Sequence, residues 1–472
     1  MTFISKINSM FKTETYLKRR NELKKKVKSG IVLLMGNGEA PFNYPNNTYR
    51  FRQDSSFLYF AGLDTPDLYC VIDIDNDNEY LFGDEHTIDD IIWMGNLPSL
   101  KERAESAGIN IVLPVAELSG MISAALKSNR EIHYLKPYRY RNQMILGELL
   151  SKKTADVLAG NSLELTKAII DLRLIKEDCE LVEMETAGEI GYQMHLEAMK
   201  FCKSGTSERE IAGIIEGIAI SKGNGVSFPT ILSQNGQILH NHNHEGILKR
   251  GRLMITDAGA EGLNYYASDF TRTIAVGGHY SQKQIDIHNI VLKAIDTSIE
   301  MIRPDIPYRD IHREAYRVIF DGLKDLGLTK GNTEDALECG APALFMPHGL
   351  GHALGLDTHD MEDLGETYVG YDDEIQRSSI FGYRSLRFGK KLKERHVITV
   401  EPGIYFIPQL IEKWKQEKIN TDFINFDKLE EYYNFGGIRL EDDVVVTKEN
   451  CLFVYCNRLP ITIDEIVEAI NS

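Results

Sequence analysis

Acidic residues lie at the ends of short apolar segments in the C-terminal half of the chain. The segment RLMITDAGAEGLNYYASDFTRTIAV predicts a β-hairpin in which Asp257 ends one strand and Asp269 lies on the next. Two carboxylates on adjacent strands, separated by a turn, can converge on one cation. Each aspartate alone has a simpler interpretation as a turn cap or a lysine partner, so a metal site depends on further residues nearby.

Histidines follow in the glycine-rich stretch MPHGLGHALGLDTHD, which contains His348, His352 and His359. Glycines allow the backbone to approach a site closely and to adopt positive φ, which suits a loop around an active centre. The helical zinc signature H-E-x-x-H is absent, because Gly349 stands where the glutamate would be. The histidines are therefore candidates for a site carried by a loop.

The remaining candidate residues lie on two apolar segments nearer the C-terminus. HVITVEPGIY predicts a strand that ends in Glu401, where Pro-Gly halts it. In NFGGIRLEDDVVVT, the strand period of two places Arg439, Glu441 and Asp443 on one face. Acidic side chains that point inward from a buried strand are costly unless they are paired or bind a metal.

Four carboxylates with at least one histidine form a hard donor set that is rich in oxygen. Such a set favours Mn²⁺, with Co²⁺, Zn²⁺ or Fe²⁺ as alternatives, over a structural zinc site made of thiolates. Four negative charges gathered in one place repel one another strongly unless two divalent cations neutralise them. The residues thus predict a centre that holds two divalent metal ions.

The order of these motifs (TDAG, SDFTRT, HGLGHALGLDTHD, TVEPGIY and GIRLEDD) resembles the pita-bread metallopeptidases. That family includes methionine aminopeptidase, prolidase and aminopeptidase P. The resemblance implies that five residues hold the two metals: Asp257, Asp269, His352, Glu401 and Glu441. Because all five are present, an enzyme is favoured over a non-catalytic peptide-binding module on the same fold.

The N-terminal part separates the members of this family. YRFRQDSSFLYFAGLDTPD, at positions 49–67, resembles the start of the aminopeptidase P N-terminal domain, which methionine aminopeptidase lacks. The implied fold class is α+β, with a smaller α/β creatinase-like domain at 1–172 and a pita-bread catalytic domain at 173–472. Within the first domain, apolar runs such as IVLLMG and SFLYFAGL predict strands.

The resemblance also implies a mechanism. Two metals about 3.5 Å apart share a water, lower its pKa and so supply a hydroxide that attacks the scissile carbonyl. Glu401 would accept the proton of this water and pass it to the leaving nitrogen. His359 would donate a hydrogen bond to the carbonyl or oxyanion, and His240 would hold or shuttle protons near the leaving group.

Four further residues are expected to bind substrate or to support the site. His348 would shape the pocket beside the proline ring. Arg439 would either orient ligands such as Asp257 through Tyr405 or contact substrate. Trp93 either reaches the active site of a neighbouring subunit, as a tryptophan does in some relatives, or lies in the core of its own domain.

The activity that follows from these expectations is that of an Xaa-Pro aminopeptidase, acting on peptides with proline at the second position. The alternative is a prolidase, which cleaves only Xaa-Pro dipeptides and must recognise the proline carboxylate. We expect a homo-oligomer, either a dimer or a tetramer. The sequence leaves the native metal and the preferred first residue open.

Composition excludes several other classes of protein. The formal charge of −17 argues against nucleic acid as a partner. No apolar stretch is long enough to span a membrane, and the first residues lack the apolar core of a signal peptide. Six scattered cysteines indicate reduced thiols. We therefore expect a cytoplasmic protein that binds neither nucleic acid nor a membrane.

Two segments depart from the family pattern. A charged and aromatic insert at 409–433 separates Glu401 from Glu441. The tract HNHNHEG contains His240, His242 and His244, of which the family pattern accounts only for the first. A third metal at this tract is weighed against exposed loop histidines, and the latter interpretation is favoured.

Overall fold

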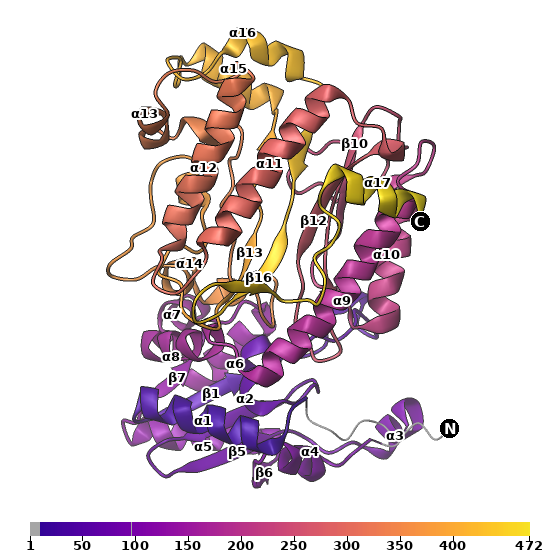
Figure 1. Ribbon diagram of the computed structural model, residues 1–472. Helices are drawn as coiled ribbons and strands as arrows, with labels where there is room; N and C mark the ends of the chain where they lie inside the picture. The colour runs from indigo at the N-terminus through magenta and orange to yellow at the C-terminus, as the bar shows by residue number, and fades with distance from the viewer. Residues whose placement is uncertain (1–9, 96) are drawn as a thin grey trace. The chain divides into compact units, whose positions relative to one another are not determined.

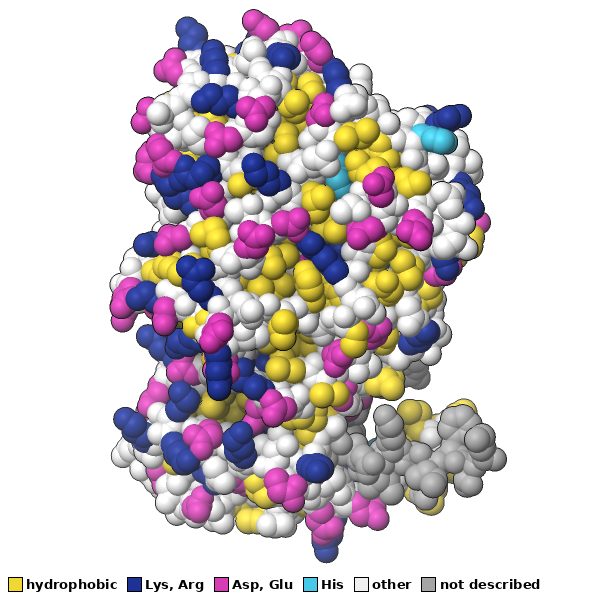
Figure 2. Space-filling view, viewed as in Figure 1, with side chains coloured by type: hydrophobic (Ala, Val, Ile, Leu, Met, Phe, Trp, Pro, Cys, Tyr) yellow, Lys and Arg dark blue, Asp and Glu magenta, His cyan; other side chains and the backbone are white. Residues whose placement is uncertain are grey.

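The computed structural model describes residues 10–95 and 97–472 (Figure 1). It divides into two compact units, of which the first ends at Arg173 and the second comprises Leu174–Ser472. Among the described residues, no helix combines the length and the apolar character that crossing a membrane requires. On the face drawn in Figure 2, acidic and basic side chains of the described residues are intermixed rather than segregated.

The N-terminal unit is built on a five-stranded sheet in the order β6-β5-β4-β1-β7. Its strands are β1 (Ile31–Met35), β4 (Tyr69–Asp73), β5 (Asn78–Phe82), β6 (Ile111–Leu113) and β7 (Ile132–Tyr134), beside a small hairpin of β2 (Pro41–Tyr44) and β3 (Asn47–Thr48). The β1–β4 and β4–β5 pairs are antiparallel, and the two outer pairs are parallel.

The described part of this unit also contains helices. They are α1 (Thr13–Val27), α2 (Ser55–Ala61), α3 (Ile88–Met94), α4 (Leu100–Ser106), α5 (Val115–Lys127), α6 (Tyr140–Leu150), α7 (Thr154–Ala159) and α8 (Leu163–Leu174). Ile122 of α5 and Leu146 of α6 pack with Val71 and Phe82 of the sheet in one buried core. The unit is therefore a mixed α/β domain.

The prediction of a strand at SFLYFAGL is wrong, because this segment forms helix α2. The Asp54 carboxylate accepts a hydrogen bond from the backbone N–H of Phe57 and so caps the helix. Gly62, in the left-handed conformation at φ 65°, ends it. Every residue of α2 is buried, so the apolar run shows no helical period that could distinguish it from a buried strand.

The C-terminal unit places short antiparallel strands inside a layer of long helices. Its strands are β8 (Gly225–Val226), β9 (Ile231–Ser233), β10 (Leu253–Ala258), β11 (Ala260–Glu261), β12 (Phe270–Ala275), β13 (Val397–Val400), β14 (Gly403–Tyr405), β15 (Gly437–Arg439), β16 (Asp442–Val446) and β17 (Cys451–Phe453). They pair as β12-β10-β9, β13-β16-β17, β14-β15 and β11-β8.

The longer helices of this unit are α9 (Asp178–Phe201), α10 (Glu208–Lys222), α11 (Gln282–Met301), α12 (Tyr308–Asp325) and α17 (Ile463–Asn471), with shorter helices α13 (Thr333–Glu338), α14 (Glu366–Val369), α15 (Pro408–Gln416) and α16 (Phe426–Leu429). Helices α9 and α10 run together beside β10 and β12, whereas α11 and α12 lie side by side near β13 and β16 (Figure 1). This arrangement encloses the strands that carry the candidate residues.

Backbone pairing aligns those strands with one another. The predicted hairpin is confirmed as β10 and β12, in which Asp257 lies opposite Thr271. Thr271 also forms an isolated bridge with Glu441, which links β12 to the segment between β15 and β16. A further bridge between Ala353 and Ile398 fastens the histidine stretch to β13. The acidic strand ends therefore meet at one place.

Candidate active site

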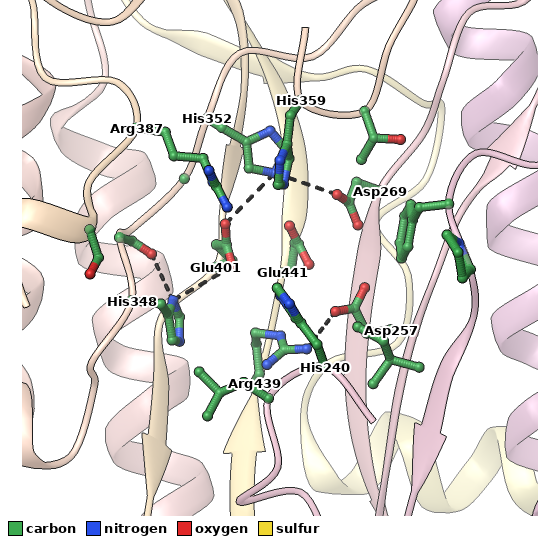
Figure 3. Close-up of a pocket in the computed structure, with 18 of the residues that line it drawn as sticks. His240, Asp257, Asp269, His348, His352, His359, Arg387, Glu401, Arg439 and Glu441 are labelled. Carbon is green, nitrogen blue, oxygen red and sulfur yellow. Dashed lines mark hydrogen bonds and ion pairs between the residues drawn. The ribbon is translucent and has the colours of Figure 1, made fainter. Parts of the chain in front are cut away.

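The predicted metal-ligating residues line one cavity of about 540 Å³ (Figure 3). Asp257 lies on β10 and Asp269 directly precedes β12, whereas Glu401 directly follows β13. Glu441 lies between β15 and β16, and His352 comes from the loop that precedes the bridge to β13. Segments far apart in the chain thus bring five donors to a single wall.

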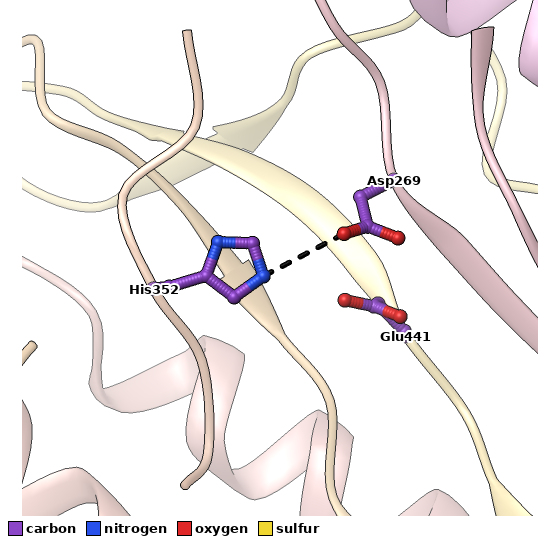
Figure 4. Close-up of side chains that lie close together, drawn as sticks. All are labelled: Asp269, His352 and Glu441. Carbon is purple, nitrogen blue, oxygen red and sulfur yellow. Dashed lines mark ion pairs between the residues drawn. The ribbon is translucent and has the colours of Figure 1, made fainter. Parts of the chain in front are cut away.

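Three of these side chains form a tight buried cluster (Figure 4). One ligand atom from each of Asp269, His352 and Glu441 lies within 4.8 Å of the others. His352 Nε2 is 3.5 Å from Asp269 Oδ2 and 3.8 Å from Glu401 Oε1. Asp257 lines the same cavity but forms an ion pair with Arg439.

The carboxyl groups of the cluster are strongly perturbed. Burial raises the pKa of Asp269 and of Glu441 well above the ordinary carboxyl value, and neighbouring carboxylates raise each pKa further. Burial raises the pKa of Glu401 to about 8, although Arg439 opposes the shift. Asp269 Oδ1 and Glu441 Oε1 are buried without a hydrogen-bond partner among the described residues. Divalent cations would satisfy these oxygens and neutralise the repulsion, so the donor set fits metal ions.

The orientation of His352 also fits a metal ligand. Its Nδ1 donates to the carbonyl oxygen of Ala353 at 3.1 Å, which leaves the lone pair of Nε2 facing the carboxylates. Burial lowers the pKa of His352 well below the ordinary histidine value, with His359 adding to the effect. A neutral imidazole held by a backbone carbonyl is the common form of a metal-binding histidine.

Arg439 joins two of the acidic residues. Its guanidinium group forms an ion pair with Asp257 and donates to the Tyr405 hydroxyl at 2.8 Å. It also donates to Thr271 Oγ1 at 3.1 Å, and that hydroxyl donates to Glu441 Oε2 at 2.7 Å. The contact with Asp257 is direct, whereas the two roles predicted from the sequence were a link to Asp257 through Tyr405 and a contact with substrate.

His348 is fixed as a neutral ring. Its Nδ1 donates to the carbonyl oxygen of Gly349 at 2.8 Å, and its Nε2 accepts from the Tyr405 hydroxyl at 2.9 Å. Burial lowers the pKa of His348 to about 3, and Arg439 lowers it further. With both nitrogens engaged, the ring is a wall of the cavity rather than a proton donor.

His359 lies against the ring of His352, with centroids 4.2 Å apart. Its Nδ1 is hydrogen-bonded to the Glu362 carboxylate, and this bond, opposed by burial, helps lower the pKa of Glu362 to about 2. His359 lines the cavity. The Glu362 carboxylate thus fixes the orientation of the His359 ring.

The histidine tract does not form a metal cluster within the described ranges. His240 and His242 line the cavity, whereas His244 turns away and is hydrogen-bonded to the carbonyl oxygen of Leu232 at 3.1 Å. Desolvation lowers the pKa of His240 below the ordinary histidine value, and Arg439 lowers it further. The three rings therefore have separate surroundings.

Two predictions concern residues outside this cavity. Trp93 lies on α3 of the N-terminal unit and is 83% exposed, so the interpretation as a core residue is wrong. The insert at 409–433 forms α15 and α16, and none of its residues lines the cavity among those described. Tyr432 of the insert stacks on Phe406, next to β14.

Arg387 is a cavity residue that the sequence did not reveal. It lines the same wall as His359 and forms ion pairs with Glu362 and Glu366. It lies in a region of turns and short helices without apolar periodicity, so no motif marks it. Only the tertiary fold brings this second cation to the site.

Comparison with known proteins gives the family. The model for metallopeptidase family M24 matches residues 182–448, and the model for the aminopeptidase P N-terminal domain matches residues 16–134. A probable Xaa-Pro aminopeptidase of Leptosphaeria maculans is 30% identical over 438 residues, which cover 92% of this chain and 73% of that protein. The Xaa-Pro dipeptidase of Homo sapiens is 29% identical, over 93% of this chain and 88% of that enzyme.

Solved structures agree with this assignment. A zinc-substituted Escherichia coli aminopeptidase P in complex with product is 26% identical, with a TM-score of 0.79 and coverage of 98% of both chains. The M24 model alone spans more than half of this chain. The chain therefore has the two-domain pita-bread fold and belongs to metallopeptidase family M24, with an N-terminal domain of the aminopeptidase P type.

Proposed function

We propose that this enzyme is an Xaa-Pro aminopeptidase, which removes the first residue from peptides that have proline in second position. The observation that carries the proposal is the buried cluster of Asp269, His352 and Glu441, with Asp257 and Glu401 on the same cavity wall. Relatives named Xaa-Pro aminopeptidase match nearly the whole chain and support it. Cytoplasmic location is part of the proposal, because the six cysteines are scattered along the sequence without a C-x-x-C pair.

The donors suit two divalent cations, and Mn²⁺ is the metal we propose because four of the five ligands are carboxylates. When bound, such ions would activate a water and polarise the scissile carbonyl. Five residues would hold them: Asp257, Asp269, His352, Glu401 and Glu441. Arg439 would keep the Asp257 carboxylate in position, because their ion pair is buried at the cavity wall.

The chain's own residues would move the protons. Glu401 is the base in this proposal, since its carboxylate lines the cavity and would be ionised, and so able to accept a proton, once metal is bound. His359, held by Glu362 through Nδ1, would donate from Nε2 to the oxygen on which negative charge develops. His240 would accept or relay a proton near the leaving nitrogen, on the cavity wall it shares with Asp257.

Selection for proline would come from shape. Proline has no N–H and a fixed φ, so a cavity wall that offers no acceptor at that point loses nothing by binding it. The neutral His348 ring, locked by Tyr405 and Gly349, supplies such a wall. The N-terminal amine would face the carboxylates at the opposite end.

The position of Arg387 on the cavity wall favours the alternative function, that of a prolidase. A dipeptidase must recognise the free carboxylate of proline, and a guanidinium group on the cavity wall offers a bidentate partner for it. Glu362 and Glu366 already share this cation, which weakens its pull on a substrate carboxylate. Relatives of both names match the chain.

A comparison of Xaa-Pro with Xaa-Pro-Yaa-Zaa substrates tests the proposal, after chelation and with Mn²⁺ added back. We expect cleavage of the tetrapeptide, and we expect Arg387→Met to change its kcat/KM by less than about threefold. Cleavage confined to dipeptides, with loss of that activity in Arg387→Met, would establish the prolidase instead. An enzyme inactive with every added divalent metal would refute both.

A homo-oligomer, dimer or tetramer, also belongs to the proposal. Helix α3 has no buried residue, and its apolar residues Ile88, Ile92 and Trp93 are 70%, 69% and 83% exposed. Contiguous exposed apolar side chains mark interaction surfaces, and we propose that Trp93 reaches the cavity of a neighbouring subunit. The molar mass of Trp93→Glu by light scattering and its peptidase activity, each compared with the wild type, test this. A variant with the mass and the activity of the wild-type oligomer would rule it out.

A further inference from the structure

A buried carboxylate fastens both ends of the loop that carries His240. Glu208, the first residue of α10, is 2% exposed. Its Oε1 accepts from the backbone N–H of Gln234 at 2.7 Å, and its Oε2 accepts from the backbone N–H of Gly246 at 3.0 Å. The N–H of Glu208 in turn donates to the Gly246 carbonyl at 2.9 Å. One side chain thus closes the loop 234–246.

Gly246 is fitted to this carboxylate. A Cβ atom placed on Gly246 would lie 2.5 Å from the carboxyl carbon of Glu208, which is closer than such atoms approach. Ser207 and Ile247 form a backbone bridge directly beside the contact. The last residue of the tract HNHNHEG is therefore explained by its approach to α10 rather than by metal chemistry.

Side chains of the loop reinforce the same closure. Gln234 accepts from the N–H of Lys249 at 2.7 Å and donates to the Ile247 carbonyl at 2.8 Å. Asn241 donates to Ser233 Oγ at 2.9 Å. These contacts fix the backbone on both sides of His240, whose own side chain lines the cavity.

Among the described residues, the Glu208 carboxylate has no ion-pair partner, and its hydrogen-bond donors are the two backbone N–H groups of the loop. A buried carboxylate is costly unless hydrogen bonds compensate it. The two loop N–H groups, together with the N-terminus of α10, provide that compensation. An apolar residue would fill the space without this cost, so the carboxylate is explained by the loop it holds.

We propose that Glu208 is a positioning residue that sets the place of His240 on the cavity wall. The proposal deepens the function proposed above and rests on it for the catalytic role of His240. Gln at position 208 retains one acceptor oxygen and turns an amide donor toward the other N–H. One end of the loop is then released while the volume is kept.

The test compares Glu208→Gln with Glu210→Gln, an exposed position on the same turn of α10. Steady-state kinetics on an Xaa-Pro tetrapeptide and the bound Mn²⁺ content are measured for each. We expect Glu208→Gln to lose about tenfold or more in kcat, with KM within about threefold and full metal content, and Glu210→Gln to match the wild type. Wild-type kcat in Glu208→Gln, when His240→Ala is impaired, would overturn the proposal.

A double mutant separates positioning from a general structural defect. In the His240→Ala background, Glu208→Gln should cause no further fall in kcat, because the group it places is gone. If the double mutant instead shows the product of the two single-mutant losses in kcat, the proposal is contradicted. The single variant Gly246→Ala should lower kcat as Glu208→Gln does, because the added Cβ would displace the Glu208 carboxylate.

Hydrogen exchange of the amides in 234–246 gives a readout that does not depend on catalysis. Faster exchange confined to this loop in Glu208→Gln supports the proposal, and unchanged exchange overturns it. If His240→Ala retains full kcat, the catalytic role of His240 in the proposed function is refuted. The exchange measurement still decides whether Glu208 holds the loop.

Discussion

Binding of metal to the metal-free enzyme should release protons at pH 7. Burial raises the pKa of Glu401 to about 8, so about nine-tenths of this carboxyl is protonated at pH 7 in the absence of metal. Burial also raises the pKa of Asp269 and Glu441 well above the ordinary value. A carboxyl must be ionised to bind a cation, so these protons leave when the metal enters.

The size of the release follows from the same groups. Glu401 alone contributes about 0.9 proton per molecule at pH 7, and Asp269 and Glu441 each add up to about one more. His352 contributes none, because burial lowers its pKa and it is already neutral. Below the raised pKa values, apparent metal affinity should fall about tenfold per released proton for each unit of pH, or ~1.4 kcal/mol.

Titration calorimetry with Mn²⁺ measures this release when it is done in two buffers that differ in ionisation enthalpy. At pH 7, the apparent binding enthalpy plotted against the ionisation enthalpy of the buffer should have a slope that corresponds to about one to three protons released per enzyme molecule. At pH 9 the share from Glu401 should drop to about 0.1. Glu401→Gln is the matched control and should release about one proton fewer at pH 7. An enthalpy independent of the buffer at pH 7, or an uptake of protons, would refute the reasoning.

Glu401→Gln should lower kcat by at least ~10²-fold with a smaller effect on KM, the scale of a lost general base, and wild-type turnover at saturating Mn²⁺ would exclude that role. His359→Ala should lower kcat by ~10–10³-fold if its hydrogen bond forms in the transition state, which an effect on KM alone would contradict. His242→Ala should keep the full complement of metal by elemental analysis, whereas loss of one ion would move a metal to the histidine tract. Arg272→Met should destabilise the fold by about 3–5 kcal/mol in urea denaturation, because it leaves the buried Asp442 short of a partner; a loss below 1 kcal/mol would show that other contacts suffice.

Local patterns predicted the strands that carry the acidic residues. In β10 an apolar segment leads up to Asp257, and β13 ends where Pro-Gly follows Glu401, so neighbours in the chain determine both. The five proposed ligands line one cavity.

Long-range contacts account for what the sequence could not predict. Arg387 reaches the cavity only because the turns after the histidine stretch fold back beside His359. The direct contact of Arg439 with Asp257 joins β15 to β10, which no periodicity indicates. Helix α2 was mistaken for a strand because complete burial removes the contrast between faces on which the distinction depends.

The bridge between Thr271 and Glu441 has a consequence for synthesis of the enzyme. The first and the last of the proposed ligands are separated by most of the C-terminal unit, and the bridge of Thr271 with Glu441 and the ion pair of Arg439 with Asp257 bring them together. A nascent chain that has not yet exposed Glu441 lacks this junction, and its early aspartates cannot retain metal as the finished cavity would. Metal loading should therefore follow completion of the chain, so that a truncated or stalled product stays metal-free and without peptidase activity in the cell.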